Sequence, residues 1–155
     1  MFLKYLLILT MTMGISTTAM AAGSSSSSSS PSTSQSSYAA AEKAVKAGKY
    51  KKAVKLLNKE VKRDANNADA WNYLGFSNRK LKKYDASLAA YKKALAINPK
   101  HRGANEYLGE LYLQTDKVSK AKTQLATLKK ICKSRCEEYD DLKQAIAVYE
   151  ANHGS

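Results

Sequence analysis

The sequence has few residues that end a helix. Two prolines and seven glycines occur in 155 residues, and these are the two residue types that most disfavour helical backbone. Hydrophobic residues make up 44% of the chain and charged residues 25%, which is close to an ordinary soluble domain. The length and composition therefore predict one modest, mostly helical domain.

Cysteine is also scarce, with two residues, Cys132 and Cys136. Residues four apart in a helical turn have Cα atoms about 6 Å apart, within the range for a disulfide. A metal site would need more ligands than this pair supplies, and His101 and His153 are the only histidines. A dithiol redox couple normally has a two-residue spacing. A disulfide is the preferred prediction, with the metal site and the redox couple as alternatives; no cofactor is expected.

No hydrophobic run is long enough to cross a bilayer, which takes about 18 residues or more. The apolar stretch of residues 5–15 follows Lys4 and precedes a small-residue motif that ends at Ala21. This pattern predicts a cleaved signal peptide, residues 1–21. The mature protein is then expected to be periplasmic or secreted and not an integral membrane protein.

Residues 22–37 are dominated by serine and contain little that a core could bury. Such a composition is typical of a flexible linker.

Acidic residues are half as numerous as basic ones, 13 against 26, and the net charge is +13. The predicted first hairpin has the densest basic run, and its basic face consists of Lys51, Lys52, Lys55 and Lys59. A solvated helix face explains such a run, and docking to anionic lipid headgroups or an anionic envelope polysaccharide is the functional alternative. Nucleic acid is a less plausible partner for an exported chain.

An internal repeat of 34 residues organises the rest of the chain. Lysines recur at that spacing, and a small residue follows each lysine by four positions. The lysines are Lys49, Lys83 and Lys117, and the small residues are Ala53, Ser87 and Ala121.

The middle copy of the repeat resembles the tetratricopeptide repeat family. The residues that carry the resemblance are Trp71, Leu74, Gly75, Ser87, Tyr91, Ala94 and Pro99. The third copy keeps Leu108 and Gly109. In each copy the glycine is expected to let the second helix of the repeat pack against the first. The resemblance implies an all-α fold, a right-handed solenoid of three helical hairpins with a C-terminal capping helix.

The repeats are expected at about 34–67, 68–101 and 102–134, followed by a capping helix at about 135–151 and a tail of residues 152–155. Within them, helices are predicted at about 38–47, 50–63, 68–81, 84–97, 102–115 and 118–131. Ser134 and Glu137 have the spacing of a capping box for the last helix. Leu142, Ile146 and Tyr149 form the apolar stripe with which that helix would close the solenoid. The segment around the two cysteines resembles the C-terminal end of small exported bacterial tetratricopeptide proteins.

No nucleophile with a neighbouring base and no phosphate-binding glycine loop is present, so an enzyme is not expected. The resemblance implies a non-catalytic adaptor or scaffold in the bacterial cell envelope, which binds a peptide or a partner helix in a concave groove.

By the same resemblance the groove residues are Asn72, Phe76, Arg79, Glu106, Glu110 and Leu113. Replacing Phe76 and Arg79 with alanine is expected to change folding little. A clamp for a C-terminal carboxylate is not reproduced, because Tyr38 and Tyr73 occupy two of its positions. Basic attachment to lipid or polysaccharide and metal binding through the cysteines remain the alternative functions.

Overall fold

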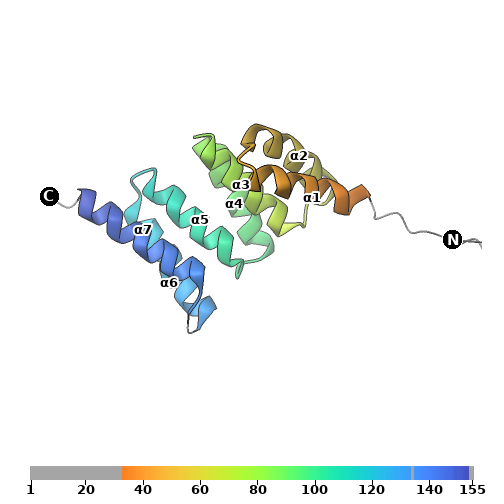
Figure 1. The fold of residues 1–155 in the computed structure, drawn as a ribbon. Coiled ribbons are helices and arrows are strands. Elements are labelled where there is room, and N and C mark those ends of the chain that lie inside the picture. The colour runs from red at the N-terminus through yellow and green to blue at the C-terminus, as the bar shows by residue number, and fades with distance from the viewer. Residues whose placement is uncertain (1–32, 134, 154–155) are drawn as a thin grey trace, which may run out of the picture.

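The computed structural model describes residues 33–133 and 135–153, with the side chains of residues 33–36 excepted (Figure 1). The predicted signal peptide, most of the predicted linker, and Ser134 of the predicted capping box lie outside the described residues. The described part consists of helices and contains no strand, so the predicted all-α fold is confirmed. The helices are α1 (Thr33–Lys46), α2 (Tyr50–Arg63), α3 (Ala68–Lys80), α4 (Tyr84–Ile97), α5 (Arg102–Leu113), α6 (Val118–Cys132) and α7 (Glu137–His153).

The start of α1 corrects the linker prediction. The helix begins at Thr33, inside the stretch predicted to be flexible up to residue 37. One contact of this stretch with the fold is the hydroxyl of Ser37, which donates a hydrogen bond of 2.7 Å to the carboxylate of Glu60 in α2. Glu60 is only 1% exposed and also pairs with Arg63. A serine that satisfies a buried carboxylate has a structural task that composition alone does not reveal.

The turns inside the three hairpins repeat at the same 34-residue spacing as the lysines. Gly48, Lys82 and Asp116 adopt positive φ angles of 67°, 59° and 55°. In each turn the amide of the next residue, a lysine, donates to the carbonyl five residues earlier, over 2.8 to 2.9 Å. This is the hydrogen-bond pattern of a helix that ends with one left-handed residue. The sequence repeat is therefore also a repeat of backbone conformation.

Lys82 and Gly48 allow a matched test of these turns. The left-handed backbone conformation costs a residue with a Cβ about 1 kcal/mol or more, whereas glycine adopts it freely. Lys82 is exposed, so Lys82→Gly should raise the melting temperature by a few degrees. The opposite change, Gly48→Ala, should lower it, since open space surrounds Gly48 and only its φ angle opposes a side chain. Calorimetry of both variants provides the measurement, and a lower melting temperature for Lys82→Gly would contradict it.

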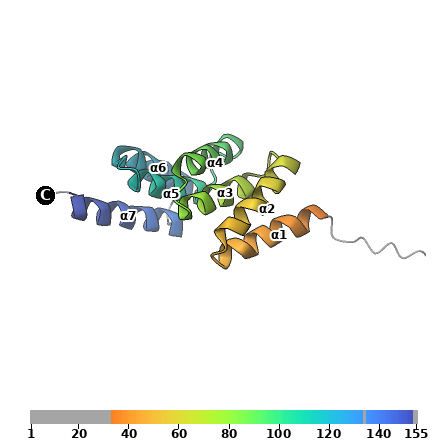
Figure 2. The same cartoon turned by 90° about the horizontal axis from the view of Figure 1, so that it is seen from above.

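The odd-numbered helices form one continuous layer. α1 contacts α3, α3 contacts α5, and α5 contacts α7, while α2, α4 and α6 each pack against the helices that precede and follow them in the chain. Figure 2 shows α1 and α7 at the two ends of this row, both on the same side of α3 and α5. The row of odd-numbered helices therefore curves, and its inner side is the concave face.

Gly75 and Gly109 each lie where another helix comes too close for a side chain. For Gly109 the neighbouring helix is not the one predicted from the sequence. A Cβ on Gly75 would lie 2.6 Å from the ring of Tyr91 in α4, so this glycine admits the second helix of its own repeat, as predicted. A Cβ on Gly109 would lie 2.5 Å from the side chain of Leu142. Leu142 belongs to α7 and not to α6, so Gly109 admits the last helix, and the prediction for its partner is wrong.

α7 completes the core at the end of the solenoid. Leu142 is 0% exposed and Ile146 is 5% exposed, and both pack against apolar side chains of α5 and α6. Those side chains are Leu113, Ala121 and Leu128. Tyr149 also contributes, since it lies against this cluster and its hydroxyl donates to Asp116 over 3.0 Å. Within the described residues, no helix is long and apolar enough to cross a membrane.

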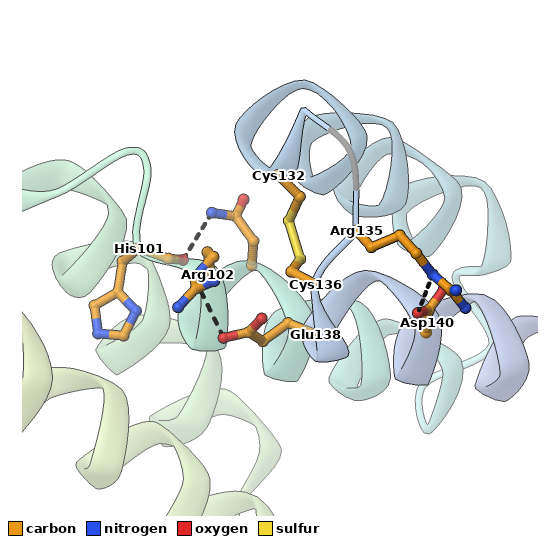
Figure 3. Close-up of a disulfide and its surroundings, with 8 residues drawn as sticks. His101, Arg102, Cys132, Arg135, Cys136, Glu138 and Asp140 are labelled. Atoms are coloured by element: carbon orange, nitrogen blue, oxygen red, sulfur yellow. Dashed lines mark hydrogen bonds and ion pairs between the residues drawn. A yellow bond between two sulfur atoms is a disulfide. The ribbon is translucent and has the colours of Figure 1, made fainter.

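A disulfide joins Cys132 at the end of α6 to Cys136, directly before α7 (Figure 3). The predicted pairing is thus confirmed, and the sulfurs are bonded to each other and not to a metal. The carbonyl of Cys136 accepts hydrogen bonds of 3.2 Å from the amides of Tyr139 and Asp140 in the first turn of α7. The disulfide consequently fixes the point at which α7 begins.

Candidate functional site

A cavity of about 460 Å³ opens on the face formed by the odd-numbered helices. Side chains from α1, α3, α5 and α7 line it, together with His101 from the loop before α5. The lining residues are Tyr38, Asp69, Asn72, Tyr73, His101, Gly103, Glu106, Tyr107, Glu137, Glu138 and Asp141. Its size is in the range of small-ligand pockets, so it has room for one or two side chains of a partner.

The repeat explains how these side chains come together. Tyr38, Asn72 and Glu106 are 34 residues apart and so occupy the same position in α1, α3 and α5. Tyr73 and Tyr107 form a second equivalent pair one residue further along. Because equivalent positions point the same way in stacked repeats, each helix adds its members to one surface.

The cavity is acidic although the protein is basic. Five of its lining residues are Asp or Glu, and none is Lys or Arg, whereas the whole chain has a net charge of +13. Two of the acids are paired at the rim. His101 contacts Asp69 over 3.0 Å. Arg102 contacts Glu138 over 3.4 Å (Figure 3).

Two polar side chains in the cavity lack partners within the described part of the chain. Asn72 is 6% exposed, and its side-chain oxygen accepts no hydrogen bond there. Glu106 is also 6% exposed, and among residues 33–133 and 135–153 it forms neither a hydrogen bond nor an ion pair. Buried polar groups are normally satisfied. These two acceptors are therefore unusual and face the same space.

Burial raises the pKa of the Glu106 carboxyl to about 8. Negative charge nearby acts in the same direction, from Glu110 on α5 and from Asp141 and Glu138 on α7, while Arg79 on α3 acts in the opposite direction. At neutral pH the carboxyl therefore tends to keep its proton. A positive charge placed in the cavity would favour the ionised form.

Glu106→Gln should show this effect as a change in the pH dependence of stability. In the folded protein the pKa lies above the usual 4.5, so the folded state binds more protons than the unfolded state between about pH 4.5 and pH 8. The contribution of Glu106 to the free energy of unfolding then falls as pH rises through this window. Glutamine removes the penalty, so the variant should be more stable than the wild type above pH 8 and nearly equal below pH 4.5.

Urea unfolding at several pH values measures this difference. Glu137→Gln is the matched control, because Glu137 lines the same cavity but is exposed. A Glu106→Gln variant that is equally stabilised at every pH would contradict the linkage.

The six predicted groove residues fall into three places. Asn72 and Glu106 line the cavity. Phe76, Arg79 and Glu110 lie together beside it: Arg79 pairs with Glu110 across α3 and α5, and its guanidinium carbon lies 5.4 Å from the centre of the Phe76 ring. Leu113 is 8% exposed and belongs to the core cluster with α6 and α7, so its assignment to the groove is corrected.

The prediction for Arg79 needs the same correction. Arg79 is 4% exposed and connects two repeats, so replacing it with alanine is expected to disturb the fold. Phe76 is partly buried, and its ring centre lies 4.9 Å from that of Tyr107 and 6.0 Å from that of Tyr50. These side chains form an aromatic and ionic junction between neighbouring repeats.

Sequence reasoning did not assign most of the cavity. It considered Tyr38 and Tyr73 only as residues that replace a carboxylate clamp. It missed Tyr107 and the acids Asp69, Glu137, Glu138 and Asp141. Two signals were available: the 34-residue equivalence of Tyr73 with Tyr107, and the acidic start of the last helix, which reads as favourable charge at a helix N-terminus. The favourable charge at the helix N-terminus is enough to explain these acidic residues. The sequence therefore does not indicate that they also line a cavity.

The predicted basic face lies away from the cavity. Lys51, Lys52, Lys55 and Lys59 are all exposed on α2, and α2 contributes no residue to the lining. These four lysines are thus apart from the acidic residues of the cavity. In the described residues no group of three or more His, Cys, Asp and Glu is arranged to hold a metal ion.

Comparison with known proteins supports the repeat assignment. The family model described as tetratricopeptide repeat matches residues 68–101, which are the middle repeat. Superkiller complex protein 3 of Mus musculus is 29% identical over 85 residues, which are 55% of this chain and 5% of that protein. The chain therefore spans about 5% of the length of this relative.

Two solved structures show the same fold at low identity. The Yersinia enterocolitica type III secretion chaperone SycD, in complex with a peptide of the translocator YopD, superposes with a TM-score of 0.68 at 19% identity, covering 79% of this chain and 93% of that one. The first tetratricopeptide domain of Spaghetti (RPAP3), bound to the HSP90 peptide SRMEEVD, superposes with a TM-score of 0.66 at 19% identity, covering 74% and 91%. The middle repeat therefore matches the tetratricopeptide repeat, and the helices of the described residues share the fold of these solved tetratricopeptide structures.

Proposed function

We propose that this protein is a non-catalytic adaptor that binds a segment of another protein on the face of its odd-numbered helices. The observation that carries the proposal is the cavity built there from equivalent positions of successive repeats, where the buried side-chain oxygen of Asn72 has no partner among the described residues. SycD and RPAP3, which share the fold, have both been solved with peptides. The same arrangement of helices offers a peptide several side-chain contacts at once.

The setting we propose is an exported one, in a bacterial cell envelope. The disulfide between Cys132 and Cys136 supports it, because disulfides persist in oxidising compartments. The N-terminal sequence pattern supports it independently.

A selection experiment tests the adaptor function. Peptides of about 12 residues, selected from a random displayed library on the oxidised protein, should shift backbone amide resonances of Asn72, Glu106 and Tyr107 in the isotope-labelled protein. They should lose affinity about tenfold or more for Gly103→Met, which would fill the cavity. A Cβ at Gly103 meets nothing closer than 3.4 Å, so the backbone accepts this substitution and the fold should persist.

The opposite outcome is equally clear. Selected peptides that bind Gly103→Met as well as the wild type, and instead shift resonances of α2, would exclude the cavity as the binding site. The alternative function, attachment to anionic lipid or polysaccharide through Lys51, Lys55 and Lys59, would then be favoured. It predicts binding that weakens steeply with salt and that is lost on reversing these lysines to glutamate.

A further inference from the structure

We propose that the cavity receives a basic side chain, the ammonium of a lysine or the guanidinium of an arginine, from the bound segment. This inference rests on the proposed adaptor function and names the chemistry that the cavity selects. It is carried by three features of the described residues: the sign of the charge, the unpartnered acceptors, and the aromatic rings around them.

The charge of the cavity is local. Asp69, Glu106, Glu137, Glu138 and Asp141 are five of only 13 acidic residues in the chain, yet they line one cavity. The net charge of the protein would repel a cation at long range. Affinity for a cation must therefore come from these carboxylates and not from the overall field. The attraction is limited to a cation that lies in this cavity.

The side-chain oxygen of Asn72 is an acceptor, and the Glu106 carboxyl becomes one with both oxygens when it loses its proton. The side-chain oxygen of Asn72 is buried with no donor among the residues that the structure describes. Among the same residues Glu106 has no ion-pair partner, because Arg79 is paired with Glu110. A ligand that has donors and no acceptor matches both groups. Lysine ammonium and arginine guanidinium are the protein groups with that property.

Three tyrosine rings complete the site. Tyr38 and Tyr73 lie with ring centres 6.2 Å apart, and Tyr107 lines the cavity beside them. Ring faces attract cations and also cover the methylene stem of a long basic side chain. The neighbouring rings already do so within the fold: Arg79 lies 5.7 Å from the centre of Tyr107, and Lys80 lies 5.2 Å from that of Phe76.

The charge of the cavity also differs from what an acidic peptide requires. The HSP90 peptide bound by RPAP3, SRMEEVD, has three acidic residues and one basic residue. A peptide of that charge would place carboxylates against Glu106 and its neighbours. The cavity of this protein therefore favours the opposite kind of ligand on the same fold.

Binding of a cation should be coupled to proton release. Glu106 is faced by Glu110 on α5, by Glu138 and Asp141 on α7, and by Arg79 on α3. A basic side chain stabilises its ionised form, so affinity should rise as pH increases from about 6 to about 9. Replacement of Glu106 by glutamine should remove most of this dependence.

The experiment uses blocked peptides of the form acetyl-Gly-Ser-Xaa-Ser-Gly-amide, in which Xaa is Lys, Arg, norleucine or Glu. Each is titrated into the isotope-labelled, oxidised protein at about pH 8. The Lys and Arg peptides should shift resonances of Asn72, Glu106 and Tyr107, and the norleucine and Glu peptides should not. In Glu106→Gln the affinity for the Lys peptide should fall about tenfold or more.

Glu150→Gln is the matched control. It makes the same change of charge on α7, but Glu150 pairs with Lys122 at the surface, outside the cavity, so its affinity for the Lys peptide should equal that of the wild type. A norleucine peptide that binds as well as the Lys peptide would overturn the inference and leave the adaptor function standing. Spermidine that binds more tightly than the Lys peptide would assign the cavity to small amines and overturn it as well. Selected library peptides that are blocked by Gly103→Met but lack Lys and Arg would do the same.

Discussion

A chain that ends at Lys133 should lose cooperative folding of its C-terminal hairpin. The truncation removes α7 and with it Leu142 and Ile146, which are almost fully buried. Burying a side chain of this size contributes about 1.5–3 kcal/mol, and the apolar side of α5 and α6 would also become exposed. The sum is a large share of the 5–15 kcal/mol that stabilises a typical domain. Thermal melts followed by circular dichroism, with a dye that binds exposed apolar surface, provide the measurement.

A matched pair of variants in the full chain separates the loss of the core from the loss of helix length. Ile146→Ser removes a buried side chain, whereas Val148→Ser changes a side chain on the same helix that is 54% exposed. The first should lower the melting temperature by roughly ten degrees or more and the second by little. Truncation with an unchanged melting temperature would show that α7 is an appendage and that its burial adds nothing.

Much of the fold was predictable because the repeat appears in the sequence at several levels. The 34-residue spacing of the lysines coincides with the left-handed turns at Gly48, Lys82 and Asp116, and six of the seven described helices both begin and end within two residues of the predicted bounds. The errors lie where one repeat meets something other than its own partner. α1 extends into the serine-rich stretch, and Gly109 faces Leu142 of the last helix. The 34-residue repeat pattern predicts neither the extension of α1 nor the approach of Leu142 to Gly109.

The site was harder to predict than the fold, for a physical reason. A helix pattern distinguishes polar from apolar positions, but it does not show which polar positions become buried between neighbouring helices. Arg79 and Glu110 are predicted from the sequence as groove residues and are in fact paired with each other between α3 and α5. Glu138 and Asp141 read as charges that stabilise a helix N-terminus, and the curvature of the solenoid brings them to Asn72 and Glu106. Residue type was visible in the sequence, whereas the pairing needed the geometry.

Arg79→Ala should cause a large loss of stability, in contrast to the expectation from sequence alone. The side chain of Arg79 is 3% exposed and that of Glu110 is 27% exposed. Removing one member of a largely buried pair leaves the other charge uncompensated, which typically costs about 3–5 kcal/mol. The aromatic faces of Phe76 and Tyr107 lose a cation at the same time. Urea unfolding of the variant should show a correspondingly lower midpoint.

A double-mutant cycle distinguishes the pair from the packing of the arginine stem. Glu110→Gln alone leaves Arg79 without its carboxylate. Combined with Arg79→Met, which keeps much of the apolar stem, it removes both charges. The double variant should be less destabilised than the sum of the two single variants, because no unpaired charge remains.

Arg79 also lowers the pKa of Glu106, so its removal should raise that pKa further and weaken binding of the Lys peptide at neutral pH more than at pH 9. A structural loss alone would reduce binding equally at both pH values. If Arg79→Ala instead melts like the wild type and loses peptide binding at every pH, then Arg79 is a direct contact for the partner. The cavity between the four odd-numbered helices would in that case be only one part of a longer binding surface that includes the junction between α3 and α5.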